Sequence, residues 1–382
     1  MTGVVLLGST GSIGRQTLEV IAAHRDQFSV VGLAAGRRSD DFAAQLGEWP
    51  GARAWCSDGR PADLAGDRWV ADGLEELATL DDAEIVVVAT TGMTALPAVL
   101  AALRGGRRVA LANKETLVTG GHLVDRVLTE MGGDRLDRLR PIDSEHSAIW
   151  QCLAGERLDE VARLILTASG GPFRVRLAGE LEDVTPAQAL AHPNWRMGPK
   201  ITIDSATLVN KAFEAIEAKW LYRLSYDRIQ AVIHPQSVVH SLVEFTDGSF
   251  KAQLGVPDMR LPIQYALTYP RRLPSPARHA APQEWGTLQF EALESGRFPA
   301  YDAVRAAADA GGNRGTILNA ADEAAVAAFL AGTITFPRIA EVIGDAVERW
   351  GDSSEPDLEA IVILDGEVRA ALSVELGLGG TD

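Results

Sequence analysis

Short apolar segments alternate with longer amphipathic segments along the first third of the chain. Four continuously apolar segments occur, at residues 4–7, 30–35, 84–89 and 108–111. Since they lack the alternation of a half-exposed strand, we expect strands buried on both faces, as in a parallel sheet. The segments between them, such as residues 16–23 and 97–104, repeat apolar residues at helical spacing. The pattern predicts a doubly wound α/β domain over residues 1–140.

The middle of the chain mixes strand patterns with one long irregular segment. Strand patterns occur at residues 164–168, 201–204, 231–234, 238–245 and 249–254. The last two flank Asp247-Gly248, a dipeptide typical of a tight hairpin turn. Residues 170–198 contain several glycines and prolines without a clear period, as in a linker or a functional lid. We expect an α+β domain over residues 141–269.

The last quarter of the chain has a helical pattern. Residues 270–289, rich in proline and arginine at their start, predict a linker. Three alanine-rich segments follow, at residues 301–310, 317–330 and 337–350. Their apolar residues recur at i, i+3 and i+4, which predicts a C-terminal α-helical domain over residues 290–382.

Composition and charge restrict the classes of partner. The formal net charge of −16 argues against nucleic acid or an anionic membrane as a partner. An acidic chain can still bind a phosphate group, but only with local lysines, hydroxyls or helix N-termini. Cys56 and Cys152 lack metal-ligand spacing, and the first strand follows no basic leader. No apolar run is long enough to cross a bilayer, so we expect a cytoplasmic protein.

The loop after the first predicted strand is glycine-rich. Its sequence, Gly8-Ser9-Thr10-Gly11-Ser12-Ile13-Gly14, opens the first predicted helix. Glycines allow the backbone to approach a pyrophosphate, and the helix N-terminus offers N–H groups to it. Turns also use glycine for their own geometry, but the position after the first strand favours a dinucleotide site. The second strand ends at Gly36-Arg37-Arg38. Arginine at this position can bind the 2′-phosphate of NADPH and so favours NADPH over NADH. The alternative is that both arginines are solvated surface residues.

Charged residues follow the predicted strand 108–111 and open the middle domain. Lys114, in Ala112-Asn113-Lys114-Glu115, comes at a strand end that would face a ligand crevice, although such Lys-Glu pairs are often surface ion pairs. In Asp143-Ser144-Glu145, an extended backbone would direct both carboxylates to one side. Their oxygens suit Mg²⁺ or Mn²⁺. Alternatively, Asp143 or Ser144 caps the helix that follows.

A second polar segment runs from Asp204 to Glu214. Asp204 or Ser205 resembles a helix N-cap after a short strand. Asn210 and Lys211 precede Glu214 by four and three residues, so the three side chains would share one helix face. Together with the helix N-terminus they predict a phosphate site, whereas a solvated face with one ion pair is the alternative.

Two histidine-proline segments complete the candidates. His192-Pro193-Asn194-Trp195 lies in the irregular segment, where a tryptophan in a polar loop indicates packing on a partner or ligand. His234 and His240 belong to a second such segment, and we interpret them as structural imidazoles.

Together these motifs resemble those of the 1-deoxy-D-xylulose 5-phosphate reductoisomerases of the non-mevalonate isoprenoid pathway. Further matching segments are Ser169-Gly170-Gly171-Pro172-Phe173, Pro257-Asp258-Met259-Arg260 and Asn319-Ala320-Ala321, so the resemblance covers nearly the whole chain in the family's order. It implies a homodimer that rearranges the carbon skeleton of a small phosphorylated sugar by retro-aldol cleavage and re-addition (or a 1,2-shift). NADPH then reduces the product to 2-C-methyl-D-erythritol 4-phosphate.

The resemblance also implies roles for individual residues. A divalent ion, Mg²⁺, Mn²⁺ or Co²⁺, would be held by the carboxylates of Asp143, Glu145 and Glu214. Residues binding the substrate phosphate would be Ser169, His192, Ser205, Asn210 and Lys211. Ser144 and Lys114 would contact other oxygens of the substrate, and Glu145 and Glu214 would also bind the substrate. The expected catalytic residues are Lys114 and the three carboxylates. The NADPH site would comprise Gly8, Thr10, Gly11, Ser12, Ile13, Gly36, Arg37, Arg38, Asn113, Glu115 and Gly198. Trp195 and Met197 would belong to a flexible lid within residues 170–198.

The chain departs from the family pattern at three places. Ala191 stands where relatives often have Lys or Arg, Asp322 replaces a usual Asn, and Arg37-Arg38 replaces a pair such as Lys-Asn. Two other functions compete with the implied one. A simple NADP-dependent dehydrogenase would not need three carboxylates, and a nucleotide-sensing module would bind NADPH without depending on a metal.

Overall fold

The computed structural model describes residues 1–176, 178–193, 195 and 197–378. The chain divides into two compact units, each built from non-contiguous segments. The first unit comprises Met1–Thr116, Leu123–Trp150 and Asp258–His279. The second unit comprises Leu117–His122, Gln151–Pro257 and Ala280–Asp382, as far as it is described.

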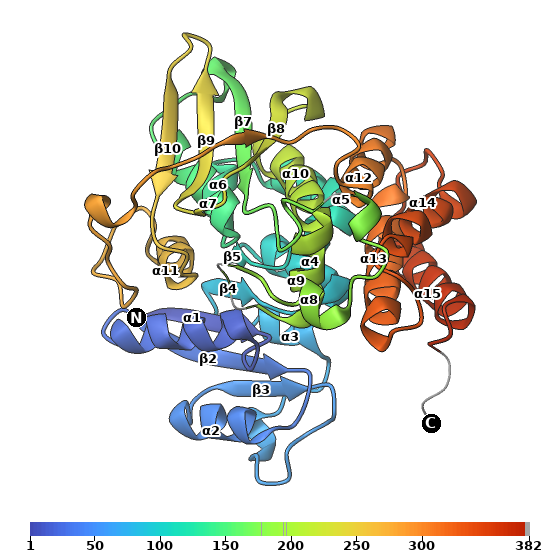
Figure 1. The fold of residues 1–382 in the computed structure, drawn as a ribbon. Coiled ribbons are helices and arrows are strands. Elements are labelled where there is room, and N and C mark those ends of the chain that lie inside the picture. The colour runs from blue at the N-terminus through green and yellow to red at the C-terminus, as the bar shows by residue number, and fades with distance from the viewer. Residues whose placement is uncertain (177, 194, 196, 379–382) are drawn as a thin grey trace. The chain divides into compact units, whose positions relative to one another are not determined.

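A six-stranded parallel sheet forms the centre of the first unit (Figure 1). Its strands are β1 (Thr2–Leu7), β2 (Phe28–Ala35), β3 (Arg53–Cys56), β4 (Ile85–Val88), β5 (Arg108–Leu111) and β6 (Leu139–Pro141). The order β3-β2-β1-β4-β5-β6 is that of a doubly wound dinucleotide-binding domain, so the predicted fold class is confirmed. In this sheet β3 and β6 were not predicted, because their sequences, Arg-Ala-Trp-Cys and Leu-Arg-Pro, lack the run of consecutive aliphatic residues found in the other four strands.

Helices accompany this sheet, and one of them comes from far along the chain. The helices are α1 (Ser12–Ala23), α2 (Asp40–Glu48), α3 (Leu74–Ala78), α4 (Leu96–Arg104), α5 (Glu115–Met131), α6 (Arg135–Arg138), α7 (Ser144–Leu153) and α11 (Arg260–Thr268). Short 3₁₀ turns cover Gly66–Arg68 and Gly92–Ala95. Helix α11 packs against α1, and its Ile263 and Ala266 are fully buried in the same core as Val4 and Leu6. The first unit is therefore completed by a segment that follows it by more than a hundred residues.

The second unit contains a five-stranded mixed sheet of order β10-β9-β7-β8-β11. Its strands are β7 (Val161–Ala168), β8 (Ile229–Ile233), β9 (Val239–Phe245), β10 (Phe250–Leu254) and β11 (Glu291–Ala292). β7 and β8 are parallel, whereas the other neighbours are antiparallel. The predicted hairpin at Asp247-Gly248 joins β9 to β10, and Gly248 has the positive φ of +83° that this turn requires.

Helices of the second unit share one hydrophobic core. They are α8 (Pro186–Ala189), α9 (Pro199–Thr207), α10 (Val209–Tyr222), α12 (Pro299–Ala310), α13 (Arg314–Ala331), α14 (Arg338–Trp350) and α15 (Leu358–Glu375). Short 3₁₀ turns cover Leu158–Glu160, Ala178–Glu180, Tyr226–Arg228 and Pro282–Glu284. Ile203 of α9, Phe213 of α10 and Leu318 of α13 are fully buried in this core, and Figure 1 shows α13 beside α14 and α15.

The strand predicted at residues 201–204 is wrong, because these residues belong to α9. The sequence Ile201-Thr202-Ile203-Asp204 alternates like a strand, but Pro199 occupies the first helical turn, and α9 packs on α10 and α13. The N-cap is therefore Gly198, and not Asp204 or Ser205.

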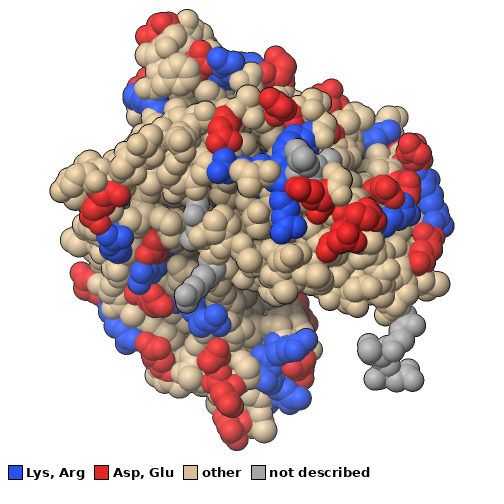
Figure 2. Space-filling model, in the orientation of Figure 1, with Lys and Arg blue, Asp and Glu red and all other residues tan. Residues whose placement is uncertain are grey.

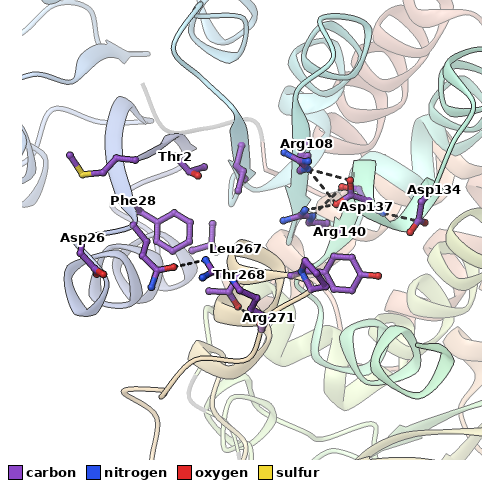
Figure 3. A pocket seen from close by; sticks show the side chains of 15 residues that line it. Thr2, Asp26, Phe28, Arg108, Asp134, Asp137, Arg140, Leu267, Thr268 and Arg271 are labelled. Carbon is purple, nitrogen blue, oxygen red and sulfur yellow. Dashed lines mark hydrogen bonds and ion pairs between the residues drawn. The ribbon is translucent and has the colours of Figure 1, made fainter. Parts of the chain in front are cut away.

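A cavity of about 790 Å³ lies in the first unit at the amino ends of the parallel strands (Figure 3). Thr2, Phe28 and Arg108, which begin β1, β2 and β5, line it. Figure 3 shows Arg108 and Arg140 both facing Asp137, which bonds to each of them. Burial alone would raise the pKa of Asp137, but the two guanidinium groups hold that pKa below its usual value. The cavity is at the opposite edge from the strand carboxyl ends, where α/β sheets bind ligands.

Candidate functional site

The glycine loop in the first unit connects β1 to α1 through close backbone contacts. Gly8 has a φ of +87°, and a Cβ atom there would lie 2.5 Å from the carbonyl oxygen of Ala89. At Gly14 a Cβ atom would lie 2.3 Å from the carbonyl oxygen of Gly8. Helix α1 begins after Gly11 with no side-chain cap and no acidic residue in its first turn. Its N-terminal N–H groups are thus suited to an anion such as a pyrophosphate.

Arg37 and Arg38 follow β2 after a single residue, Gly36, at the same edge of the sheet as Gly8. Both are exposed, as is Gly36. The backbone N–H of Arg38 donates to Oδ2 of Asp58 at 3.1 Å, which orders the turn. Within the described part of the chain neither guanidinium forms an ion pair, so both are available to a phosphate.

Asn113 links the loops that follow β4 and β5. Its Nδ2 donates to the carbonyl oxygens of Thr90 at 3.0 Å and Gly92 at 2.8 Å, and to Oε2 of Glu115 at 2.9 Å. Its Oδ1 accepts the backbone N–H of Thr116 at 2.9 Å. Asn113 therefore fixes the carboxyl edge of the sheet between β4 and β5.

Sequence reasoning missed the segment Thr90-Thr91-Gly92 at this edge. The Thr90 hydroxyl and the Ser9 hydroxyl are buried, and neither has a hydrogen-bond partner among the described residues. Buried polar groups normally have one, so both hydroxyls are candidates for ligand contacts. A signal for both was present in the sequence, because each hydroxyl residue lies two positions after the end of a buried strand.

Lys114 and Asp143 form a buried ion pair in the first unit. Nζ of Lys114 lies 2.9 Å from Oδ2 of Asp143, with side-chain exposures of 7% and 10%. The extended backbone expected at Asp143-Ser144-Glu145 is wrong, because α7 begins at Ser144. Asp143 instead caps this helix by accepting the Glu145 N–H at 3.2 Å. The Ser144 hydroxyl donates to Oε2 of Glu145 at 2.7 Å, which holds the second carboxylate.

His192 joins two hydroxyl groups in the second unit. Its Nε2 lies 3.2 Å from Oγ of Ser169 and 3.0 Å from Oγ of Ser205. Its Nδ1 accepts the backbone N–H of Trp195 at 2.9 Å, so the neutral ring carries its proton on Nε2. Burial lowers the pKa of His192, which favours this neutral form.

Gly171 allows the loop after β7 to approach α9. It has a φ of +64°, and a Cβ atom there would lie 2.6 Å from the carbonyl oxygen of Ser205. The Gly171 N–H also donates to Oγ of Ser169 at 3.2 Å. Ser169 and Ser205, 36 positions apart in the sequence, consequently meet at one histidine.

Asn210 and Lys211 both bind Glu214 within α10, as their spacing predicted. Nδ2 of Asn210 donates to one carboxylate oxygen and Nζ of Lys211 to the other. Lys211 and Glu214 are 4% and 1% exposed, which excludes a solvated face. Leu208, at a φ of 60°, separates α9 from α10 and sets the start of this helix.

The remaining candidates lie around these residues. The Trp195 ring is 6.3 Å from the His240 ring, Met197 is half-buried, and Gly198 is the exposed N-cap of α9. Asn194 and Arg196 lie outside the described residues. His234 is a structural imidazole, as predicted: its Nε2 accepts the Val239 N–H at 3.1 Å, while Nδ1 pairs with the Gln289 carbonyl oxygen at 2.8 Å.

Three family models match the chain in succession. Residues 4–121 match the 1-deoxy-D-xylulose 5-phosphate reductoisomerase model. Residues 139–222 and 254–371 match two models described as C-terminal domains of the same enzyme.

Curated relatives match over nearly the full length. A 1-deoxy-D-xylulose 5-phosphate reductoisomerase from Pelotomaculum thermopropionicum is 49% identical over 96% of this chain and 96% of its own. The enzyme of the same name from Mycobacterium ulcerans is 49% identical over 92% of this chain and 87% of its own.

Solved structures agree with the sequence relatives. The Zymomonas mobilis reductoisomerase in complex with NADPH has a TM-score of 0.88 at 38% identity and covers 98% of both chains. A reductoisomerase in complex with NADPH, fosmidomycin and magnesium has a TM-score of 0.90 at 36% identity and covers 99% of both. The chain belongs to the 1-deoxy-D-xylulose 5-phosphate reductoisomerase family.

Proposed function

We propose that this chain converts 1-deoxy-D-xylulose 5-phosphate to 2-C-methyl-D-erythritol 4-phosphate with NADPH and a divalent metal ion. The observation that carries the proposal is the pairing of two buried carboxylates with lysines, Asp143 with Lys114 and Glu214 with Lys211. A buried carboxylate needs a compensating cation, and such a site suits a reaction that develops negative charge on oxygen. The family membership supplies the substrate.

The NADPH site follows the edge of the parallel sheet. We assign the pyrophosphate to the glycine loop, with Gly8, Thr10, Gly11, Ser12 and Ile13, and the 2′-phosphate to Gly36, Arg37 and Arg38. Asn113, Glu115 and Gly198 complete the site. The uncapped N-terminus of α1 and the exposed guanidinium groups at the end of β2 support this assignment.

Asp143, Glu145 and Glu214 are the proposed metal ligands. Carboxylate oxygens fit Mg²⁺, which the similar solved enzyme contains, and also Mn²⁺ or Co²⁺. The Lys114 ammonium beside Asp143 and the Lys211 ammonium beside Glu214 provide the positive charge that each carboxylate requires. The oxygen-only set of donor atoms fits a hard divalent ion.

The substrate phosphate is assigned to Ser169, His192, Ser205, Asn210 and Lys211. The bonds of His192 to both hydroxyls support this role, because a neutral Nε2–H and two hydroxyls can all donate to phosphate oxygens. Lys211 adds the charge that a dianion needs. Trp195 and Met197, in the proposed lid at residues 170–198, would cover the bound sugar.

The chain's residues bind and orient the substrate during the rearrangement. When bound, the metal and the nicotinamide supply Lewis-acid stabilisation and hydride, respectively. Lys114 and Ser144 contact the substrate's carbonyl and hydroxyl oxygens, and Lys114 stabilises negative charge as the carbon–carbon bond breaks and re-forms. The closed lid excludes water and retains the small fragment. Binding energy from the phosphate, which does not react, contributes to closure.

The proposed enzyme is a cytoplasmic homodimer with three functional segments, residues 1–140, 141–269 and 290–382, and a linker at 270–289. None of the described helices is long and apolar enough to cross a membrane. On the face drawn in Figure 2, acidic side chains lie among basic ones, as expected for a chain that binds small molecules rather than nucleic acid.

Metal removal tests the proposal. NADPH oxidation is measured with 1-deoxy-D-xylulose 5-phosphate after chelation and again after addition of Mg²⁺ or Mn²⁺. We expect activity to vanish and return, and the product to be 2-C-methyl-D-erythritol 4-phosphate by NMR. Oxidation that persists without metal would favour a simple dehydrogenase, and NADPH binding without any turnover would favour a nucleotide sensor.

A further inference from the structure

A single lysine lies between two buried carboxylates in the second unit. Nζ of Lys200 is 2.6 Å from Oδ2 of Asp204 and 2.6 Å from Oδ2 of Asp322. The two carboxyl groups are 1% and 0% exposed. Lys200 and Asp204 lie in α9, and Asp322 lies in α13, so this Lys200 cluster joins the two helices.

The buried Asp322 carboxyl group has the Lys200 ammonium as a compensating charge. Burial raises the pKa of Asp322 above the usual carboxyl value. The Lys200 ammonium acts to lower this pKa, and the Glu323 carboxylate acts to raise it further. Glu323 is itself paired with Arg369 of α15 at 2.6 Å. Lys200 therefore faces the buried Asp322 carboxyl group and links it to Asp204 of α9.

The Lys200 cluster is adjacent to the phosphate-binding candidates. Ser205 follows Asp204 in the same helix and is the residue whose hydroxyl meets His192 at 3.0 Å. Successive helical residues point about 100° apart, so Asp204 can face α13 while Ser205 faces His192. The backbone of Ser205 also contacts Gly171 without space for a side chain between them. A shift of α9 would move Ser205 relative to both neighbours.

We propose that Asp322 is a positioning residue for the phosphate site, which through Lys200 and Asp204 holds α9 where Ser205 meets His192. This inference rests on the proposed function for the identity of the bound phosphate. An amide at this position would still accept a hydrogen bond from the Lys200 ammonium through its oxygen.

The test compares Asp322→Leu, which has the same branching but cannot accept a hydrogen bond from Lys200, with Asp322→Asn, which can. Asp345→Asn, at an exposed ion pair of α14, is the control. We expect the KM for 1-deoxy-D-xylulose 5-phosphate to rise about tenfold or more in Asp322→Leu, with the KM for NADPH within about twofold of wild type. Asp322→Asn and the control should match wild type. Equal changes in both KM values, or equal behaviour of the Leu and Asn variants, would overturn the positioning role.

Calorimetric binding of inorganic phosphate separates this inference from the proposed function. Weaker phosphate binding in Asp322→Leu than in Asp322→Asn supports the positioning role even if the wild type does not turn over the sugar phosphate. Turnover with unchanged phosphate affinity in Asp322→Leu refutes the positioning role alone. Absence of both turnover and phosphate binding in the wild type refutes both. If Asp322→Leu does not fold, Asp322→Ser replaces it, and phosphate affinity equal to that of Asp322→Asn is then the overturning result.

Discussion

His192 illustrates how one side chain can set the chemistry of a binding site. The Trp195 N–H occupies Nδ1, so only Nε2 is directed between the Ser169 and Ser205 hydroxyls. Since burial lowers the pKa of the ring, His192 is neutral before a ligand binds. A bound phosphate dianion would favour the imidazolium and raise that pKa again.

The first prediction concerns this residue. His192→Ala removes the shared partner of both hydroxyls, so the KM for 1-deoxy-D-xylulose 5-phosphate should rise by roughly one to two orders of magnitude. The KM for NADPH should stay nearly constant. In the wild type, NMR titration should place the His192 pKa below the usual histidine value without ligand and higher with inorganic phosphate. A His192 pKa insensitive to phosphate would contradict the assignment.

At the scale of an element, helix α1 depends on two glycines for its place beside the sheet. Gly14 lies within the first turn, where its Cα hydrogen faces the carbonyl oxygen of Gly8. The close approach also positions the helix N-terminus for an anion.

Gly14→Ala should therefore weaken NADPH binding and lower the melting temperature, because its Cβ would collide with backbone that cannot move freely. Gly47→Ala is the matched control, since Gly47 lies in α2 and a Cβ atom there would have no neighbour within 4 Å. The control should stabilise the protein by about 0.5–1 kcal/mol through helix propensity. Thermal unfolding measures the melting temperature of each variant, and fluorescence titration measures its NADPH affinity. Equal changes in the Gly14→Ala and Gly47→Ala variants would refute the steric argument.

The end of β2 carries the next prediction. Replacing Arg37 and Arg38 together by Ala should raise the KM for NADPH about tenfold or more and change that for NADH little, because only NADPH has the 2′-phosphate. Steady-state kinetics with both nucleotides provides the measurement. A similar rise for both would remove these arginines from the 2′-phosphate.

At the scale of the whole molecule, the two units are interleaved along the sequence. The first unit needs Asp258–His279, whose Ile263 and Ala266 are fully buried in its core. A fragment of residues 1–150 should therefore expose apolar surface and unfold at a lower temperature than the full chain. A synthetic peptide of residues 258–279 should bind the fragment and raise its melting temperature. Equal stability with and without the peptide would show that α11 is dispensable.

The sequence predicted best where pattern and length coincide. Strands β1, β2, β4 and β5 were recognised from continuous apolar runs, and the hairpin from its turn. Helix α9 was not, because its alternating Ile-Thr-Ile-Asp sequence is overruled by packing on α10 and α13. In α15 the buried apolar residues are Ile361, Val368 and Leu372. The exposed Val362 and Ile363 obscure their helical periodicity in the sequence.

The candidate site was predictable only in part. The contacts of Asn210 and Lys211 with Glu214 follow from helical spacing alone. The meeting of Ser169, His192 and Ser205 depends on tertiary packing at Gly171, for which the sequence offers no local signal. Family resemblance placed these residues in one group, and the hydrogen bonds of His192 supply the physical reason.

The late position of α11 has a consequence for synthesis of the protein on the ribosome. The chain must grow by more than a hundred residues after β6 before α11 can emerge. At an elongation rate of about 5–20 residues per second this corresponds to a delay on the order of ten seconds, far longer than a helix needs to form. During that interval the nascent parallel sheet carries an unprotected apolar surface. The order of segments along the gene thus leaves the dinucleotide-binding unit incomplete, although it begins at the N-terminus, until much of the second unit has been synthesised.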